Sequence, residues 1–159
     1  MTGANRVGDS EAQQLQTSVQ AFVRSFGLLV TKQTPCGQPV SPSHAHALMI
    51  LLDRERLGLS TSQSHLAQRL GLDKSNVARV CARLQAEEHA KQEVAPDDAR
   101  SRRLELTQRG RRMATNIQAA SLDRFRRIVA AVPGGKRKAL LESLELLRAA
   151  VATLQEEPE

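Results

Sequence analysis

The chain of 159 residues is poor in aromatic side chains: it contains three Phe, no Trp and no Tyr. Modules that bind single-stranded DNA or RNA stack the bases on aromatic side chains. The scarcity therefore argues against such modules. If the partner is a nucleic acid, we expect duplex DNA that is read by a helix.

Cysteines and long apolar runs are also scarce. The two cysteines, Cys36 and Cys81, are too few for a multi-disulfide framework. No apolar run approaches the roughly 20 residues that span a bilayer, and the polar N-terminus MTGANRVGDS has no apolar signal region. We therefore expect a cytoplasmic protein with no membrane partner. We find no Ser/His/Asp order, no Gly-rich phosphate loop and no paired-carboxylate motif, so we predict that the protein is not an enzyme.

The charge balance is basic, with 23 Lys and Arg against 17 Asp and Glu, a net charge of +6 and a pI of about 10.1. A surplus of cationic side chains favours a polyanion as partner. The distribution of the charged residues is more informative than the net charge, because residues 100–112 hold six arginines and a single acid, Glu105. This concentration predicts a basic surface near that segment.

Apolar periodicity predicts long helices at both ends of the chain. One stripe predicts a helix over about residues 11–32, before the Pro- and Gly-rich segment 34–42 ends it. A second helix is expected from about Ser43, with Leu48, Leu51 and Leu52 buried. Two further helices are expected, one over 108–132 and a last one after the turn at 133–135. The stripes consist of Leu15, Val19, Phe22, Val23, Phe26, Leu29 and Val30, and of Leu140, Leu144, Leu147, Val151 and Leu154.

Residues 60–84 predict a helix-turn-helix. A short helix carries Leu66, Ala67 and Leu70 on one face, Gly71 permits the turn, and Asp73 is a good N-cap for the next helix. The buried face of that second helix is expected to be Val77, Val80, Cys81 and Leu84. A generic amphipathic hairpin with a solvated basic face is the competing interpretation.

The exposed face of the second helix is predicted to bind DNA. The N-terminal residues of a recognition helix reach base edges in the major groove, where Asn can bind adenine and Arg can bind guanine. We therefore predict that Asn76 and Arg79 read bases. Lys74, Ser75 and Arg83 are predicted to contact phosphates.

Residues 90–107 predict a β-wing: two strand-like runs, AKQEV and RRLELT, flank the charged loop APDDARS. An arginine at the tip of a hairpin can enter the minor groove, and Arg100 is our candidate for this position. Arg102 and Arg103 are predicted near phosphates. Asp98 would be repelled by phosphate, so we expect it to pair with an arginine and shape the loop. Without the preceding helix-turn-helix, the same loop would be interpreted as a solvated charged turn.

The order of helix, helix-turn-helix, wing and two long helices resembles the multiple antibiotic resistance regulator (MarR) family. The wing of that family typically carries Asp-x-Arg, then a strand and Leu-Thr-x-x-Gly, which fall here on Asp98, Arg100, Leu106, Thr107 and Gly110. The resemblance covers roughly residues 11–155. The chain departs from it at the start of the wing, where Glu88, His89 and Gln92 stand in place of Gly-Leu and an Arg, and at Ala99.

The resemblance implies a mainly α fold with a small β-wing, a winged helix-turn-helix whose N- and C-terminal helices form a dimerisation region. The implied organisation is a disordered N-terminus at 1–10, a dimerisation helix at 11–34, a DNA-binding lobe at 43–107 and C-terminal dimerisation helices at 108–156. It also implies an obligate homodimer. Periodicity alone leaves open whether the apolar stripes are buried in a dimer or in the core of a monomer.

The signal that the protein senses is less well defined by the sequence. The resemblance implies a small lipophilic or phenolic effector, for which Phe22, Phe26, Leu48 and Met113 are candidate pocket residues, although such residues are more often core. An alternative is oxidant sensing through Cys36, which has only Lys32 as a nearby cation.

A metal site is a weaker alternative on sequence grounds. Cys36, His44 and His46 have donor atoms that suit zinc, but residues two apart on a helix point to different sides. His65 and His89 read as surface residues. We therefore predict no metal site and no cofactor.

The sequence thus predicts a transcriptional regulator that binds double-stranded DNA. The leading hypothesis is a homodimeric repressor that binds a palindromic operator and is released by a small-molecule effector. The alternative from another class is a winged-helix module for protein–protein interaction, whose basic wing binds an acidic partner.

Overall fold

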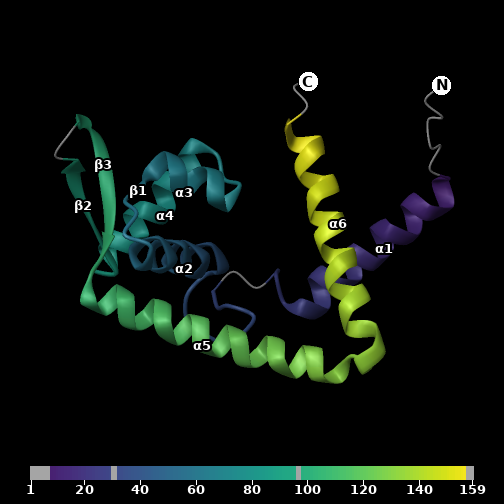
Figure 1. The fold of residues 1–159 in the computed structure, drawn as a ribbon. Helices are drawn as coiled ribbons and strands as arrows, with labels where there is room; N and C mark the ends of the chain where they lie inside the picture. The colour runs from purple at the N-terminus through teal and green to yellow at the C-terminus, as the bar shows by residue number, and fades with distance from the viewer. Residues whose placement is uncertain (1–7, 30–31, 96–97, 157–159) are drawn as a thin grey trace. The chain divides into compact units, whose positions relative to one another are not determined.

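The computed structural model of the chain describes the backbone of residues 8–29, 32–95 and 98–156, and their side chains except at 94–102 and 155–156. Within these ranges the protein is mostly helical and has one small three-stranded sheet (Figure 1). The predicted fold class, mainly α with a small β-wing, is confirmed. The elements are α1 (Asp9–Phe26), α2 (Pro42–Arg56), β1 (Thr61–Ser62), α3 (Gln63–Leu70), α4 (Lys74–Ala86), β2 (Ala90–Ala95), β3 (Asp98–Leu106), α5 (Gln108–Ala131), the short 3-10 helix η1 (Gly134–Lys136) and α6 (Arg137–Glu156).

Two compact units make up the chain, residues 1–121 and residues 122–159. The hydrophobic core lies in the first unit, where α2, α3, α4, β2, β3 and the first half of α5 contribute buried side chains. Leu48, Leu51 and Leu52 of α2 are all buried, as the sequence predicts. The core also contains Leu66, Val77, Cys81, Leu84, Leu104, Leu106, Ala114 and Ile117.

The sheet is antiparallel with the strand order β1–β3–β2. Leu104 and Leu106 of β3 are buried, and Leu104 pairs with Thr61 of β1 on one side and with Gln92 of β2 on the other. Arg54, near the end of α2, fixes the β1 edge because its guanidinium donates to Thr61 Oγ1 at 3.0 Å and to Ser60 O at 2.6 Å. The short strand β1 is not predicted by the sequence pattern.

The wing hairpin is longer than predicted, and the expected seven-residue loop APDDARS is wrong. Strand β3 begins at Asp98, so only residues 96 and 97, outside the described residues, connect it to β2. Ala95 pairs with Asp98 and Val94 with Arg102, with an irregularity between these pairs. Arg100 therefore lies within β3 and not in a loop. Backbone pairing continues through the charged residues because ladder bonds use main-chain groups, whatever the side chains are.

The first helix is shorter at its C-terminus than the predicted span of 11–32. Gly27 adopts a left-handed conformation with φ 84°, and its N–H donates to Arg24 O, which ends α1 at Phe26. At the other end, Asp9 and Ser10 are helical although we expected disorder over 1–10, and residues 1–7 lie outside the described residues. The apolar stripe continues past Gly27, which is why periodicity alone overextends the helix.

Glu88, in the turn between α4 and β2, is the described non-glycine residue with a positive φ, at 57°. A side chain in this region costs about 1–2 kcal/mol because its Cβ crowds the backbone. We expect Glu88→Gly to raise the free energy of unfolding by about 1 kcal/mol, measured by denaturant titration. The exposed Glu88–Arg109 ion pair at 3.4 Å is lost in this variant but contributes little.

The control for this prediction is Glu88→Ala, which removes the same ion pair and keeps the Cβ. No gain in stability is expected for it. If the alanine and glycine variants are equally stable, backbone strain at residue 88 is not the cause.

Candidate DNA interface

The helix-turn-helix is formed by α3 and α4, as predicted. Gly71 adopts φ 63° and ends α3, and the Leu72 N–H donates to Ala67 O at 3.0 Å. Asp73 then caps α4, because its Oδ1 accepts from the Asn76 N–H at 2.8 Å. Three residues therefore reverse the chain between the two helices.

One face of α4 is buried and the other is exposed. Val77, Cys81 and Leu84 lie in the core, and Val80 packs against it. The opposite face presents Lys74, Ser75, Arg79 and Arg83, all exposed, with Asn76 half-buried beside them. The structure thus brings together on one helix face the five residues of α4 that the sequence predicts to bind DNA.

Asn76 and Ser75 differ from the other three because their side chains bind the N-cap residue Asp73. The Asn76 side-chain amide donates to Asp73 Oδ2 at 2.5 Å, and its Oδ1 accepts from Arg79 Nη1 at 3.4 Å. Ser75 Oγ donates to Asp73 Oδ1 at 2.8 Å. The Asn76 backbone N–H, the Ser75 hydroxyl and the Asn76 amide hold the pKa of Asp73 below its usual value. Of the two predicted base readers, Arg79 therefore keeps more free donors for a base.

The side chains of the arginine-rich segment, residues 100–112, lie in different environments. The side chains of Asp98, Arg100 and Arg102 lie outside the described residues. Arg103 is half-buried and lines a hollow between β3 and the end of α2. Arg111 Nε lies 2.6 Å from Glu55 Oε1, an ion pair that joins α5 to α2.

Thr107 and Gly110 fix the start of α5 against the turn that follows α4. The Thr107 hydroxyl donates to Glu88 O at 2.6 Å and accepts from the Gly110 N–H at 3.0 Å. The Thr107 N–H donates to His89 O at 3.1 Å. Gly110 packs directly on the same carbonyl, because a Cβ at Gly110 would lie 1.8 Å from His89 O. These contacts explain the threonine and the glycine of the Leu-Thr-x-x-Gly sequence after the wing.

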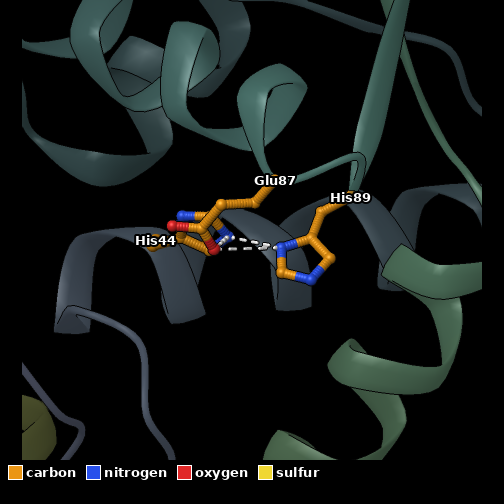
Figure 2. A group of neighbouring side chains, drawn as sticks. All are labelled: His44, Glu87 and His89. Carbon is orange, nitrogen blue, oxygen red and sulfur yellow. Dashed lines mark hydrogen bonds and ion pairs between the residues drawn. The ribbon is translucent and has the colours of Figure 1, made fainter.

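His89 is buried, so its interpretation as a surface residue is wrong. Its side chain meets His44 of α2, which is also buried, and the two rings share a hydrogen bond of 2.9 Å between His44 Nε2 and His89 Nδ1 (Figure 2). Glu87 Oε2 lies 3.5 Å from His89 Nδ1 and 3.8 Å from His44 Nε2. We call these three residues the His–Glu–His cluster. His65 is partly exposed.

Both imidazoles of the cluster are neutral at pH 7. Burial lowers the pKa of His44 to about 4, against a smaller opposing effect of the Glu87 carboxylate. Burial also lowers the pKa of His89. Burial raises the pKa of Glu87, but the hydrogen bond and the charge of Arg83 outweigh that effect, and the net pKa is lowered. With neutral imidazoles, the Arg83 guanidinium at 2.8 Å is the charge that stabilises this carboxylate.

The four candidate pocket residues occupy different environments. Leu48 is fully buried in the core and Met113 packs against that core. Phe22 and Phe26 both belong to α1, and their rings stack on each other with the centroids 5.2 Å apart. Phe22 is exposed. The role of the four residues in ligand binding stays a prediction.

The two cysteines also differ. Cys36 is half-exposed, with its Sγ 3.1 Å from Thr34 Oγ1. Cys81 is buried in the core as predicted, and burial raises the pKa of its thiol.

Residues 38–101, which run from just before α2 into β3, match the model of the MarR family. The winged-helix lobe of this chain is similar in sequence to the MarR family. The resemblance drawn from the wing residues is thereby confirmed. The family is one of DNA-binding transcriptional regulators.

Solved structures share the fold of nearly the whole chain. The PcaV transcriptional regulator from Streptomyces coelicolor is 18% identical, with a TM-score of 0.65 over 90% of this chain and 98% of that one. MepR of S. aureus in its DNA complex is 14% identical, with a TM-score of 0.63 over 92% and 99%. A probable transcriptional regulator from Pseudomonas aeruginosa is 20% identical, with a TM-score of 0.59 over 90% and 97%.

At these identities, the likeness to solved MarR-family regulators shows the fold. Among curated proteins, no sequence relative of the chain was found. None of the helices within the described residues combines the length and the apolarity needed to cross a bilayer.

Proposed function

We propose that this MarR-family chain is a cytoplasmic, homodimeric transcriptional repressor that binds a palindromic operator through α4 and the wing and is released by a small-molecule effector. The observation that carries the proposal is the division of α4 into two faces. Its buried face fixes the helix in the core, and its exposed face presents Lys74, Arg79 and Arg83. A rigidly held helix with cationic side chains on its outer face suits the major groove of duplex DNA.

The MepR–DNA complex supports the choice of duplex DNA as partner. Its protein has the fold of this chain over nearly the full length of both. In our proposal Arg79 reads a base, Asn76 and Ser75 hold the N-terminal cap and contact the backbone, and Lys74 and Arg83 contact phosphates. The wing residues Arg100, Arg102 and Arg103 are proposed to contact the adjacent DNA.

Exposed apolar side chains support the homodimer. On α1, Leu15, Val19 and Phe22 are 40–55% exposed, and on α6 several leucines are more exposed still. Large apolar side chains in such numbers mark an interaction surface. We propose that a second copy of the chain covers these faces, and light scattering in solution should then give twice the mass of the chain. The exposed residues of α6 are Leu140, Leu141, Leu144, Leu146, Val151 and Leu154.

A structure of PcaV with its natural ligand supports the effector. It is 19% identical to this chain, with a TM-score of 0.58 over 95% of this chain and 99% of that one. We propose a small lipophilic or phenolic effector here. The Phe22–Phe26 pair supplies stacked aromatic surface for such a molecule.

The experiment that tests the proposal is selection of bound duplexes from a random DNA pool with the purified full chain, repeated with phenolic compounds and with peroxide. Inverted half-sites about one helical turn apart are expected for a dimer of winged helices. Loss of binding with a phenolic compound supports effector release, whereas loss with peroxide alone favours oxidation of Cys36. Recovery of no preferred sequence would overturn the DNA-binding proposal.

Arg79→Ala is expected to weaken binding to the selected operator by about 10- to 100-fold, because it removes donors to a base edge. Binding to unrelated duplexes should change much less, since Arg79 carries base preference in addition to charge. Fluorescence anisotropy at one fixed salt concentration measures both affinities. Lys138→Ala is the matched control, because it removes one positive charge from exposed α6 and should leave the operator affinity unchanged.

If Arg79→Ala weakens specific and non-specific binding by the same factor, Arg79 contacts only phosphate. In that case the base readers lie elsewhere on α4 or on the wing.

A further inference from the structure

We propose that the His–Glu–His cluster, His44, Glu87 and His89, binds a divalent first-row transition-metal ion, Zn²⁺ in the first instance. The ligand atoms are His44 Nε2, His89 Nδ1 and Glu87 Oε2, which all lie within 4.8 Å of one another. Figure 2 shows the three side chains converging on one point from α2 and from the turn after α4.

The spacing of the three atoms suits a tetrahedral ion. Their separations are 2.9, 3.5 and 3.8 Å. Zinc bonds of about 2.0–2.1 Å to nitrogen and oxygen place tetrahedral ligands roughly 3.3 Å apart. Binding therefore requires the two ring nitrogens to separate by only a few tenths of an ångström and the carboxylate to approach by a similar amount.

The backbone around the three ligands is held in place by other contacts. His44 lies in the first turn of α2, where its N–H donates to the N-cap Ser41 Oγ at 3.4 Å. The His89 N–H donates to Leu84 O at 2.8 Å, and its carbonyl accepts from Thr107. Glu87 is the C-cap of α4. A site whose ligands are fixed before binding loses little conformational entropy when the ion enters.

The chemistry of the donors selects the class of ion. Two imidazoles and one carboxylate suit Zn²⁺, Cu²⁺ or Ni²⁺, whereas Mg²⁺ and Ca²⁺ prefer oxygen ligands. Both imidazoles are neutral at pH 7, so the ion need not displace a proton from a charged ring. Glu87 uses its other oxygen, Oε1, to bind Arg83, which leaves Oε2 for the metal.

In the metal-free cluster the two rings form a hydrogen-bonded pair. A single proton is shared between His44 Nε2 and His89 Nδ1, while the second nitrogen of each ring is buried without a partner in the described part of the chain. When an ion binds, the shared proton moves to the outer nitrogen of its own ring, so both facing nitrogens have a lone pair for the metal and both outer nitrogens carry a proton. The metal ion then accepts the lone pairs of the two neutral ring nitrogens and of the Glu87 carboxylate.

Access is from the Glu87 side, because the carboxylate is one-third exposed and both histidines are buried. Three protein ligands leave the fourth position of a tetrahedral ion for water or a small anion. The site differs from the set Cys36, His44 and His46 considered from the sequence, since His46 is exposed while His44 is buried.

The test uses the full chain stripped with a chelator and then titrated with Zn²⁺ in competition with a chromophoric chelator. One Zn²⁺ per chain is expected, with a rise in melting temperature, and Co²⁺ should give the visible absorption of a tetrahedral site. Glu87→Gln and His89→Gln are each expected to weaken Zn²⁺ binding at least roughly 100-fold, because each removes one of three ligands. Glu87→Gln keeps shape and partial exposure, so it folds even if the histidine variant does not.

His46→Gln and Cys36→Ser are the matched controls, and both should bind Zn²⁺ as the unchanged chain does. The proposal is overturned if the stripped chain takes up no stoichiometric Zn²⁺ or Co²⁺. It is equally overturned if either control loses as much affinity as Glu87→Gln, which would place the ion on Cys36 or His46. The readout is metal binding alone, so failure to bind DNA does not affect it.

Discussion

Replacement of Gly110 by alanine is expected to destabilise the protein by about 3 kcal/mol or more. A Cβ at this position would lie 1.8 Å from His89 O and 2.8 Å from His89 C. Both atoms belong to the backbone, so no side-chain rotation relieves the overlap. Either α5 moves away from the turn after α4, or the turn itself distorts and loses the hydrogen bonds that Thr107 makes to Glu88 and His89.

The measurement is the free energy of unfolding from urea titration monitored by circular dichroism. Gly135→Ala is the matched control: it makes the same change in η1, where a Cβ would meet no atom within 4 Å and φ is not positive. That variant should be unchanged or slightly more stable, because alanine reduces the conformational freedom of the unfolded chain. Equal stability of the two variants would contradict the close approach of α5 to the turn.

We also expect Gly110→Ala to lower DNA affinity more than the fraction of unfolded protein explains. The clash acts on the residues that join α4 to the wing, and α4 and the wing are proposed to contact DNA. A variant that is folded at low temperature yet weak in operator binding would show that this junction sets the angle between recognition helix and wing.

Local signals explain most of what the sequence predicts correctly. Gly71 and Asp73 determine the turn between α3 and α4 through backbone conformation and a side-chain cap, and both effects act within four residues. The start of α5 is likewise local, since Thr107 caps it. Gly27 is a local signal too, but the apolar stripe continues beyond it and predicts a longer helix.

Long-range contacts account for what the sequence does not predict. β1 is two residues long and exists because Thr61 and Ser62 pair with Leu104 and Arg103, some forty residues away. His44 and His89 are separated by 45 residues. Nothing in the sequence around His89 indicates that α2 supplies a buried partner. A single polar residue after a helix is therefore predicted to lie on the surface. The cluster becomes visible only when α2 and the turn after α4 are placed side by side.

The same cluster leads to the second large effect, a loss of stability in mild acid. In the metal-free protein, with a chelator present, the free energy of unfolding is expected to fall by about 3 kcal/mol between pH 6.5 and pH 4. Burial lowers the pKa of His44 from 6.5 to about 4, so in this range the unfolded chain takes up a proton that the folded chain does not. Stability is therefore fully present above pH 6.5 and is lost as the pH falls towards 4.

The other groups that face His44 modify this effect but do not reverse it. Glu87 raises the pKa of His44, whereas His89 and Arg83 lower it. The pKa of His89 is itself lowered, by burial and then by Arg109 against the opposing effect of Glu87, which adds to the loss in the same direction. The lowered pKa of Glu87 also favours the folded state while the carboxylate is ionised, and this contribution begins to be lost only below about pH 4.5.

The double variant His44→Leu/His89→Leu tests the origin of the acid effect. Two leucines of similar volume replace a buried polar pair, so the variant is expected to match or exceed the stability of the unchanged chain at pH 7. Its unfolding free energy should be nearly flat between pH 6.5 and pH 4.5, while His46→Leu at an exposed position should keep the original pH dependence. If the double variant and the unchanged chain lose stability in parallel over this range, the folded protein protonates His44 as readily as the unfolded chain does, and the cluster is open to water.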